Sequence, residues 1–191
     1  MFQLLNRFID AQIPAALRLN ADEERKARLL LTFAVYAVIF ACLYAPHTAF
    51  ILKNPVGAVA ICIAGVQAAL TIVFVRRAAS VRNAASMRLA AQNFTFLFVW
   101  LMGFLSWITG GVYAPALLWM PCGILVAFLF LGRKGGIVWT VVTAMNVLVM
   151  GILQMQDVVL PVLYDEQQRI QSFISGGLGA FALIAVFATL Y

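Results

Sequence analysis

The chain is organised around the stretch WITGGVYAPALLWMP, residues 107–121, which lies between two long apolar runs and is followed by GRKGG at residues 132–136. Gly110 and Gly111 can adopt the positive φ that residues with a Cβ atom avoid, and Pro115 suits the first turn of a helix. We therefore expect the chain to reverse its direction at this stretch.

Three aromatic residues flank the predicted turn: Trp107, Tyr113 and Trp119. Each ring has one polar edge, which is typical of positions where membrane hydrocarbon meets the lipid headgroups. The turn should therefore lie at a membrane interface, and the basic GRKGG stretch should lie at the opposite one.

The composition is that of an integral membrane protein. Of the 191 residues, 64% are hydrophobic and only 10% are charged, whereas about 25% are charged in soluble domains. Apolar windows of about 18 to 25 residues recur, which is the length that a helix needs to cross a bilayer. A β-barrel would require alternating polar and apolar positions, and stretches such as residues 29–40 do not alternate. We predict an all-α, polytopic membrane protein.

Six apolar windows define the expected transmembrane helices. Short links between them would make three antiparallel hairpins, formed by the first and second, the third and fourth, and the fifth and sixth helices. The predicted spans are about 29–49, 56–75, 89–107, 114–131, 136–153 and 173–191. Together they make residues 21–191 a six-helix transmembrane domain.

The first twenty residues should form a separate amphipathic segment at the membrane surface. Apolar residues such as Phe8 and Ile9 recur at helical spacing between polar ones, and Pro14 should end or kink this helix. Asn20 then precedes three acidic residues in the pattern of a helix cap. A new helix should begin at Ala21 and continue into the first span.

Basic residues fix the expected orientation, because Lys and Arg in short loops stay on the cytoplasmic side. Five precede the first span, four lie between the second and third, and two lie between the fourth and fifth, against Lys53 and Arg169 elsewhere. Both termini should therefore be cytoplasmic. Topology and lipid headgroups account for the net charge of +6, which gives no indication of a nucleic-acid partner.

The sequence offers no evident catalytic, metal or cofactor site. Asp157, Asp165 and Glu166 all fall in one predicted outer loop, and the single histidine, His47, excludes a bis-His haem within one chain. No ionisable side chain lies near the middle of a predicted span, which disfavours a proton-coupled transporter or an ion channel. No catalytic residue, metal ligand or cofactor is predicted in this chain.

Polar residues inside the spans have a structural and a functional interpretation. His47, near the outer end of the first span, could sense pH or line a ligand site, but is more simply an interfacial residue with a water partner. Gln67, Asn93 and Asn146 need partners in hydrocarbon, and we expect interhelical hydrogen bonds rather than ligand contacts.

Small residues four apart in the sixth window predict close helix packing, either within the bundle or across a dimer. The residues are Ser175, Gly176, Gly179 and Ala180.

The order TGGVYAPALLW (109–119), Pro121 and LGRKGGIVW (131–139) resembles the six-helix membrane regions at the N-termini of bacterial sensor histidine kinases and of some diguanylate and class III adenylate cyclases. Those regions are similar in having a Gly-Gly-x-x-(Ser/Ala)-Pro turn between helices three and four and a Gly-Arg turn before helix five. The corresponding turn residues here are Gly110, Gly111, Pro115, Pro121, Gly132 and Arg133.

The resemblance implies a dimeric sensory anchor in the bacterial inner membrane, whose last helix leads to a cytoplasmic coiled coil and an output domain of a two-component system or a cyclase. The chain ends at Tyr191 without a phospho-accepting histidine or a nucleotide site, so we expect an isolated membrane domain. The enzyme activity would belong to the output domain.

We therefore expect a membrane domain that relays an outer-side or membrane-borne stimulus through helix six. The predicted stimulus pocket lies near His47, Trp107, Tyr113 and Trp119, and would take an apolar or amphipathic small molecule. A cyclase anchor, a self-contained multipass transporter or channel, and a structural subunit that recruits a partner remain the alternatives.

Overall fold

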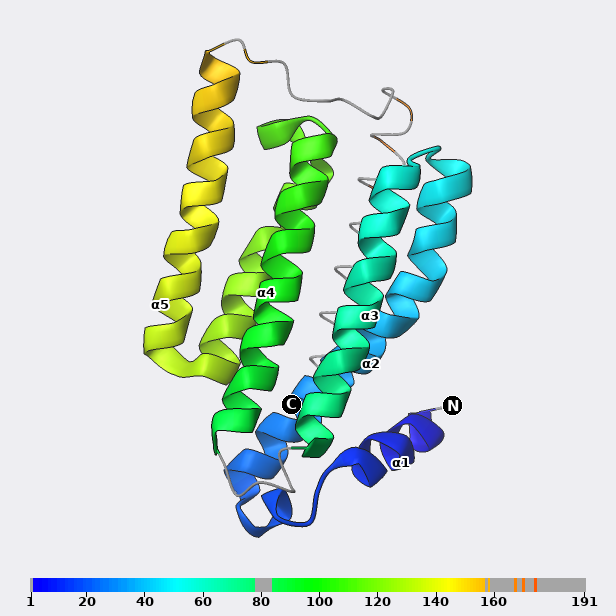
Figure 1. Ribbon diagram of the computed structural model, residues 1–191, viewed down its shortest axis with the longest axis vertical. Helices are drawn as coiled ribbons and strands as arrows, with labels where there is room; N and C mark the ends of the chain where they lie inside the picture. The colour runs from blue at the N-terminus through cyan, green and yellow to red at the C-terminus, as the bar shows by residue number, and fades with distance from the viewer. Residues whose placement is uncertain are drawn as a thin grey trace.

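The computed structural model describes residues 2–77 and 84–156, together with positions 158, 167, 170 and 174. The described residues fold into helices and the turns that connect them (Figure 1). The helical elements are α1 (Phe2–Gln12), η1 (Leu17–Leu19), α2 (Ala21–Pro46), η2 (His47–Ile51), α3 (Pro55–Arg77), α4 (Ala84–Ile108), η3 (Gly111–Tyr113), η4 (Pro115–Trp119) and α5 (Met120–Met155).

Four helical stretches are long and apolar enough to cross a membrane: Ala21–Ile51, Pro55–Arg77, Ser86–Ile108 and Pro115–Met155. The all-α class and the membrane character predicted from composition are thereby confirmed. The first three stretches contain the first three predicted windows, and the fourth contains two. The six-span count and the pairing into hairpins stay predictions, because the window 173–191 lies outside the described residues apart from Ile174.

The long element α5 is broken at Gly132, where φ is 69° and ψ is −172°. Figure 1 shows the chain turning back at this point, so that α5 consists of two arms, residues 120–131 and 133–155. A Cβ atom at Gly136 would lie 2.4 Å from the ring of Phe128, which shows how closely the chain packs on itself after the turn. The GRKGG stretch is therefore a reversal, as its glycines predict.

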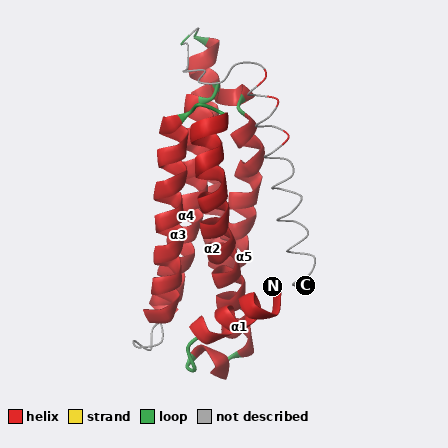
Figure 2. Cartoon of the chain, turned by 90° about the vertical axis from the view of Figure 1, so that its right-hand side faces the viewer, coloured by secondary structure: helices red, strands yellow, loops and turns green. Residues whose placement is uncertain are grey.

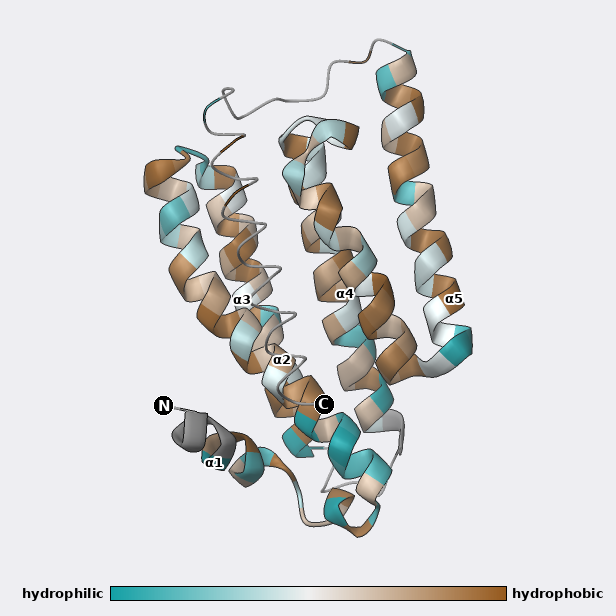
Figure 3. Ribbon diagram, turned by 180° about the vertical axis from the view of Figure 1, so that it is seen from behind, coloured by the Kyte–Doolittle hydropathy of each residue, from teal (hydrophilic) through white to brown (hydrophobic). Residues whose placement is uncertain are grey.

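Helices that follow one another in the chain pack against one another: α2 against α3, α3 against α4, and α4 against α5. Alanines such as Ala60, Ala64 and Ala68 of α3 are buried at these contacts, and small side chains let helices approach closely in a membrane. Many large apolar side chains face outward instead, and hydrophobic residues recur along all the long helices in Figure 3.

The N-terminal segment has the helix boundaries and the helix cap that the sequence predicts. Helix α1 ends at Gln12, two residues before Pro14, and α2 begins at Ala21. Asn20 caps α2, because its Oδ1 accepts a hydrogen bond from the Asp22 amide at 3.0 Å. Figures 1 and 2 show α1 lying across the end of the bundle. Its position on a bilayer surface stays a prediction.

The two ends of the bundle differ in charge. The start of α2, the end of α3, the start of α4 and the turn at Gly132 lie toward the end that carries α1 (Figure 1). All the basic residues that the structure describes, except Lys53, occupy these segments or lie in α1 and η1. We call this end the basic end, and the other, with Lys53 and the glycine turn, the distal end.

Candidate functional site

At the distal end, α2 passes into α3 through a widened turn, which we call the corner (residues 46–57). Pro46 has no N–H to donate, and the ladder after it changes to a π-helical turn in which Leu52 N–H donates to His47 O at 3.1 Å. Lys53 follows in the left-handed region at φ 51°. Single π-turns inside or beside α-helices are rare and often occur at functional sites.

The corner buries polar atoms that have no hydrogen-bond partner. Five buried side-chain polar atoms have no hydrogen-bond partner among the described residues, and three of them are His47 Nδ1, Thr48 Oγ1 and Asn54 Nδ2. Asn54 is held in place because its Oδ1 accepts a hydrogen bond from Gly57 N–H at 2.8 Å at the start of α3. Each unpaired buried group costs about 1 to 3 kcal/mol, so the corner is a destabilised part of the distal end.

The ring of His47 is stacked on an aromatic neighbour. Its centroid lies 5.2 Å from that of Tyr44, and Tyr44 in turn stacks on Phe40 at 4.8 Å. These residues follow one face of the last turns of α2. His47 is thereby in contact with the last turns of α2.

The glycine turn between α4 and α5 has the predicted backbone. Gly110 and Gly111 have φ values of 114° and 66°, which only glycine adopts readily. Pro115 begins a helix as expected, but this helix is the 3-10 element η4. Pro121 lies in the first turn of α5, where a missing N–H has little cost.

A side chain from the second arm of α5 clamps this turn. Val112 N–H donates to Gln154 Oε1 at 2.9 Å, and Gln154 Nε2 donates to Gly110 O at 3.0 Å. The side-chain amide of Gln154 thus both accepts a hydrogen bond from the turn backbone and donates one to it. Gln154 was not predicted to hold the turn, because its partners are backbone groups more than forty residues away. A polar residue at the end of an apolar window is the only signal it gives.

The four residues of the predicted stimulus pocket occupy different surroundings at the distal end. Trp107 and Trp119 are half-buried and pack against one cluster of buried residues, which includes Met120 and Met150. Tyr44 packs against the same cluster, and His47 stacks on Tyr44. Tyr113 is 73% exposed and lies outside the cluster. A shared pocket for these four residues stays a prediction.

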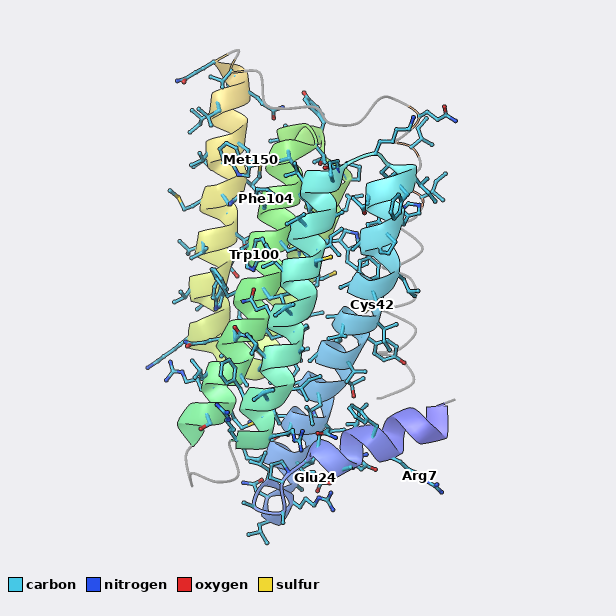
Figure 4. All side chains as sticks on the ribbon, turned by 45° about the vertical axis from the view of Figure 1, so that its right-hand side comes forward. Arg7, Glu24, Cys42, Trp100, Phe104 and Met150 are labelled. Carbon is cyan, nitrogen blue, oxygen red and sulfur yellow. The ribbon has the colours of Figure 1, made fainter. Side chains whose placement is uncertain are left out.

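The predicted interhelical hydrogen bonds are present in the middle of the bundle. Gln67 Nε2 donates to Asn93 Oδ1 at 3.2 Å, and Asn93 Nδ2 donates to Thr71 Oγ1 at 2.8 Å. Trp100 Nε1 donates to Gln67 Oε1 at 2.7 Å, and Figure 4 marks its position on α4. Neither Thr71 nor Trp100 was predicted to take part. This network joins α3 to α4.

Asn146, the third amide predicted to find a partner, behaves differently. Its Oδ1 is buried without a hydrogen bond, and its amide lies so close to α4 that a Cβ atom at Gly103 would be 3.1 Å from Nδ2. The expectation of an interhelical hydrogen bond is therefore not met at this oxygen. The contact with Gly103 makes Asn146 a packing residue of the second arm of α5.

Several predicted features lie outside the described residues. They are the small-residue motif Ser175, Gly176, Gly179 and Ala180 and the acidic residues Asp157, Asp165 and Glu166. Within the described part of the chain, no group of three His, Cys, Asp or Glu residues is placed to hold a metal ion.

Comparison of the chain with protein-family models, with curated proteins and with solved structures finds no match. The resemblance to sensor membrane regions, which rests on the turn motif in residues 109–139, stays a prediction.

Proposed function

We propose that this chain is the membrane-embedded sensory domain of a bacterial signal-transduction protein, most directly a sensor histidine kinase. It crosses the inner membrane several times with both termini in the cytoplasm, and functions as a homodimer. A stimulus at the distal end shifts the packing of the bundle, and the sixth helix passes this shift to a cytoplasmic output domain. The stimulus is an apolar or amphipathic small molecule.

Three of the five buried polar atoms without a hydrogen bond among the described residues lie in the corner, and this clustering is the observation that carries the proposal. His47 Nδ1, Thr48 Oγ1 and Asn54 Nδ2 are buried at the distal end without partners, whereas the amides of Gln67 and Asn93 in the bundle centre satisfy each other. A ligand or a rearrangement that supplies partners at the corner would gain free energy that the resting state lacks. Unequal stabilisation of two states is what a sensor requires.

The centre of the bundle favours a sensor over a transporter. Ion and proton pathways through membranes use Asp, Glu, Lys, Arg or His side chains inside the spans, and the predicted spans have none near their middles. The central polar network consists of neutral amides, a hydroxyl and an indole. Such groups fasten helices together and carry no charge across the membrane.

A chimera would test the proposal. Residues 1–191 would replace the membrane domain of a histidine kinase with a measurable reporter, and Thr48→Val would be introduced at the corner. Valine keeps the shape of Thr48 and removes its unpaired hydroxyl, so it should stabilise the resting state by about 1 to 3 kcal/mol. We expect the reporter output to change by about 5-fold or more, as such a coupling energy implies.

Phe50→Leu is the matched control, because Phe50 is in the same turn and 81% exposed. It should leave the output unchanged. Equal outputs for Thr48→Val and the parent chimera, at equal amounts of inserted protein, would contradict the proposal. Solute flux through vesicles containing the purified chain, above that of protein-free vesicles, would instead support a transporter.

A further inference from the structure

The basic end carries a surface made of exposed arginines and exposed apolar side chains. We define it by Arg7, Arg76 and Arg88, which are all exposed, and by Phe8 and Leu19, which are 48% and 89% exposed. Figure 4 shows Arg7 extending away from the bundle. We call this region the α1 surface.

Packing brings these residues from three helices to one end of the bundle. Ile9 of α1 is buried in the same cluster as Val75 of α3 and Met87 of α4. Arg76 and Arg88 directly follow these two cluster residues in the sequence. Helix α1 packs against α2 and α3 at this end, so its arginine adds to the positive charge that the arginines of α3 and α4 bring to the same end of the bundle.

The acidic residues of the basic end do not neutralise the arginines of the α1 surface. Every acidic residue that the structure describes forms an ion pair with Lys26 or Arg28. The pairs are Asp22 and Glu23 with Lys26, and Asp10 and Glu24 with Arg28. The arginines of the α1 surface lie outside these four pairs, so an external anion would have to balance them.

We propose that the α1 surface binds the headgroups of anionic phospholipids. The guanidinium groups of Arg7, Arg76 and Arg88 would contact the phosphates, since arginine matches phosphate geometry with two parallel hydrogen bonds. Phe8 and Leu19 would enter the boundary between headgroups and acyl chains, as the apolar side chains of interfacial helices do. A soluble anion would use the arginines and leave these two apolar side chains in water.

The docking of α1 does not depend on the proposed contacts. Ile9 and Ile13 are 2% and 4% exposed, and Arg28 Nη1 lies 2.9 Å from Asp10 Oδ1. Because Arg7 and Arg88 take no part in these interactions, they can be replaced without undocking the helix. The inference is independent of the proposed sensory function, since a transporter could carry the same surface.

Electron paramagnetic resonance of spin-labelled lipids provides the test. The whole chain would be reconstituted in phosphatidylcholine vesicles, and the immobilised fractions of spin-labelled phosphatidylglycerol and phosphatidylcholine would be compared. We expect a preference for phosphatidylglycerol that salt weakens. Each basic residue near an anionic surface is worth about fivefold in binding, so Arg7→Gln/Arg88→Gln should remove most of the preference.

Arg133→Gln/Lys134→Gln is the matched control, because it removes the same charge from the basic end at the turn of α5. This pair should keep the preference. An equal loss in both pairs, or no preference in the parent chain, would overturn the proposal. Displacement of the labelled phosphatidylglycerol by glycerol phosphate or by a short oligonucleotide would also overturn it, because it would assign the surface to a soluble anion.

Discussion

Replacing Gln154 by Met should release the glycine turn from α5. Methionine has nearly the same length and shape, but it can neither accept from Val112 N–H nor donate to Gly110 O, as Gln154 does at 2.9 and 3.0 Å. Each such hydrogen bond contributes about 0.5 to 1.5 kcal/mol to stability. Loss of both should favour local opening of the turn by about 1 to 3 kcal/mol, or about 5-fold to 150-fold in the opening equilibrium.

Hydrogen exchange of the Val112 amide measures this opening directly, because that amide is the donor to Gln154. Its exchange in detergent micelles should accelerate by the factor given above, while amides in the middle of α3 keep their rates. Gln156→Met is the control, since Gln156 is exposed and lies two residues further on. An unchanged rate at Val112 in Gln154→Met, or equal acceleration in both variants, would refute the reasoning.

Two further substitutions test the fold. Asn93→Leu removes three side-chain hydrogen bonds to Gln67 and Thr71. At about 0.6 kcal/mol each, their loss should lower the free energy of unfolding in mixed micelles by about 2 kcal/mol. Gln92→Leu, at an exposed neighbour, should not lower it, and equal losses in the two variants would contradict the network's role. Gly132→Ala should lower the free energy of unfolding by about 1 to 3 kcal/mol in the same assay, because alanine is strained at the positive φ of this position. No atom lies within 4 Å of the added Cβ, so a steric clash would not contribute. A neutral result would argue against the reversal.

Local chemistry made much of the fold predictable. The cap at Asn20, the end of α1 before Pro14 and the positive φ of Gly110 and Gly111 each depend on a residue and its immediate neighbours. The apolar windows located α2, α3 and α4. Helices α3 and α4 extend beyond their windows at both ends, because helix propensity continues through the polar flanks. Helix α2 begins before its window, at Ala21, but ends inside it, at Pro46. The break at Gly132 was likewise predictable from its glycine-rich neighbourhood.

The candidate site was less predictable, because its interactions join distant segments or depend on alternatives of nearly equal energy. Nothing in the sequence near Gln154 specifies the turn that it holds, and Trp100 was not expected to donate to Gln67. In the π-turn after Pro46, each N–H bonds to the carbonyl five residues earlier, whereas in an α-helix it bonds to the carbonyl four residues earlier. The spacing of apolar residues in the sequence does not distinguish these two patterns. His47 was noticed, but its unpaired neighbour Thr48 was not.

The positions of the side-chain amides indicate which helices are joined by hydrogen bonds. Water is absent from the membrane interior, so a lost partner there is not replaced and the remaining group bears the full cost. The Gln67–Asn93 network fastens α3 to α4, and Gln154 fastens the glycine turn to α5. Neither fastening includes a residue of α2 or η2. A displacement of the corner at His47 would therefore break neither of these two sets of hydrogen bonds, whereas a displacement of α4 would break the bonds between Gln67 and Asn93.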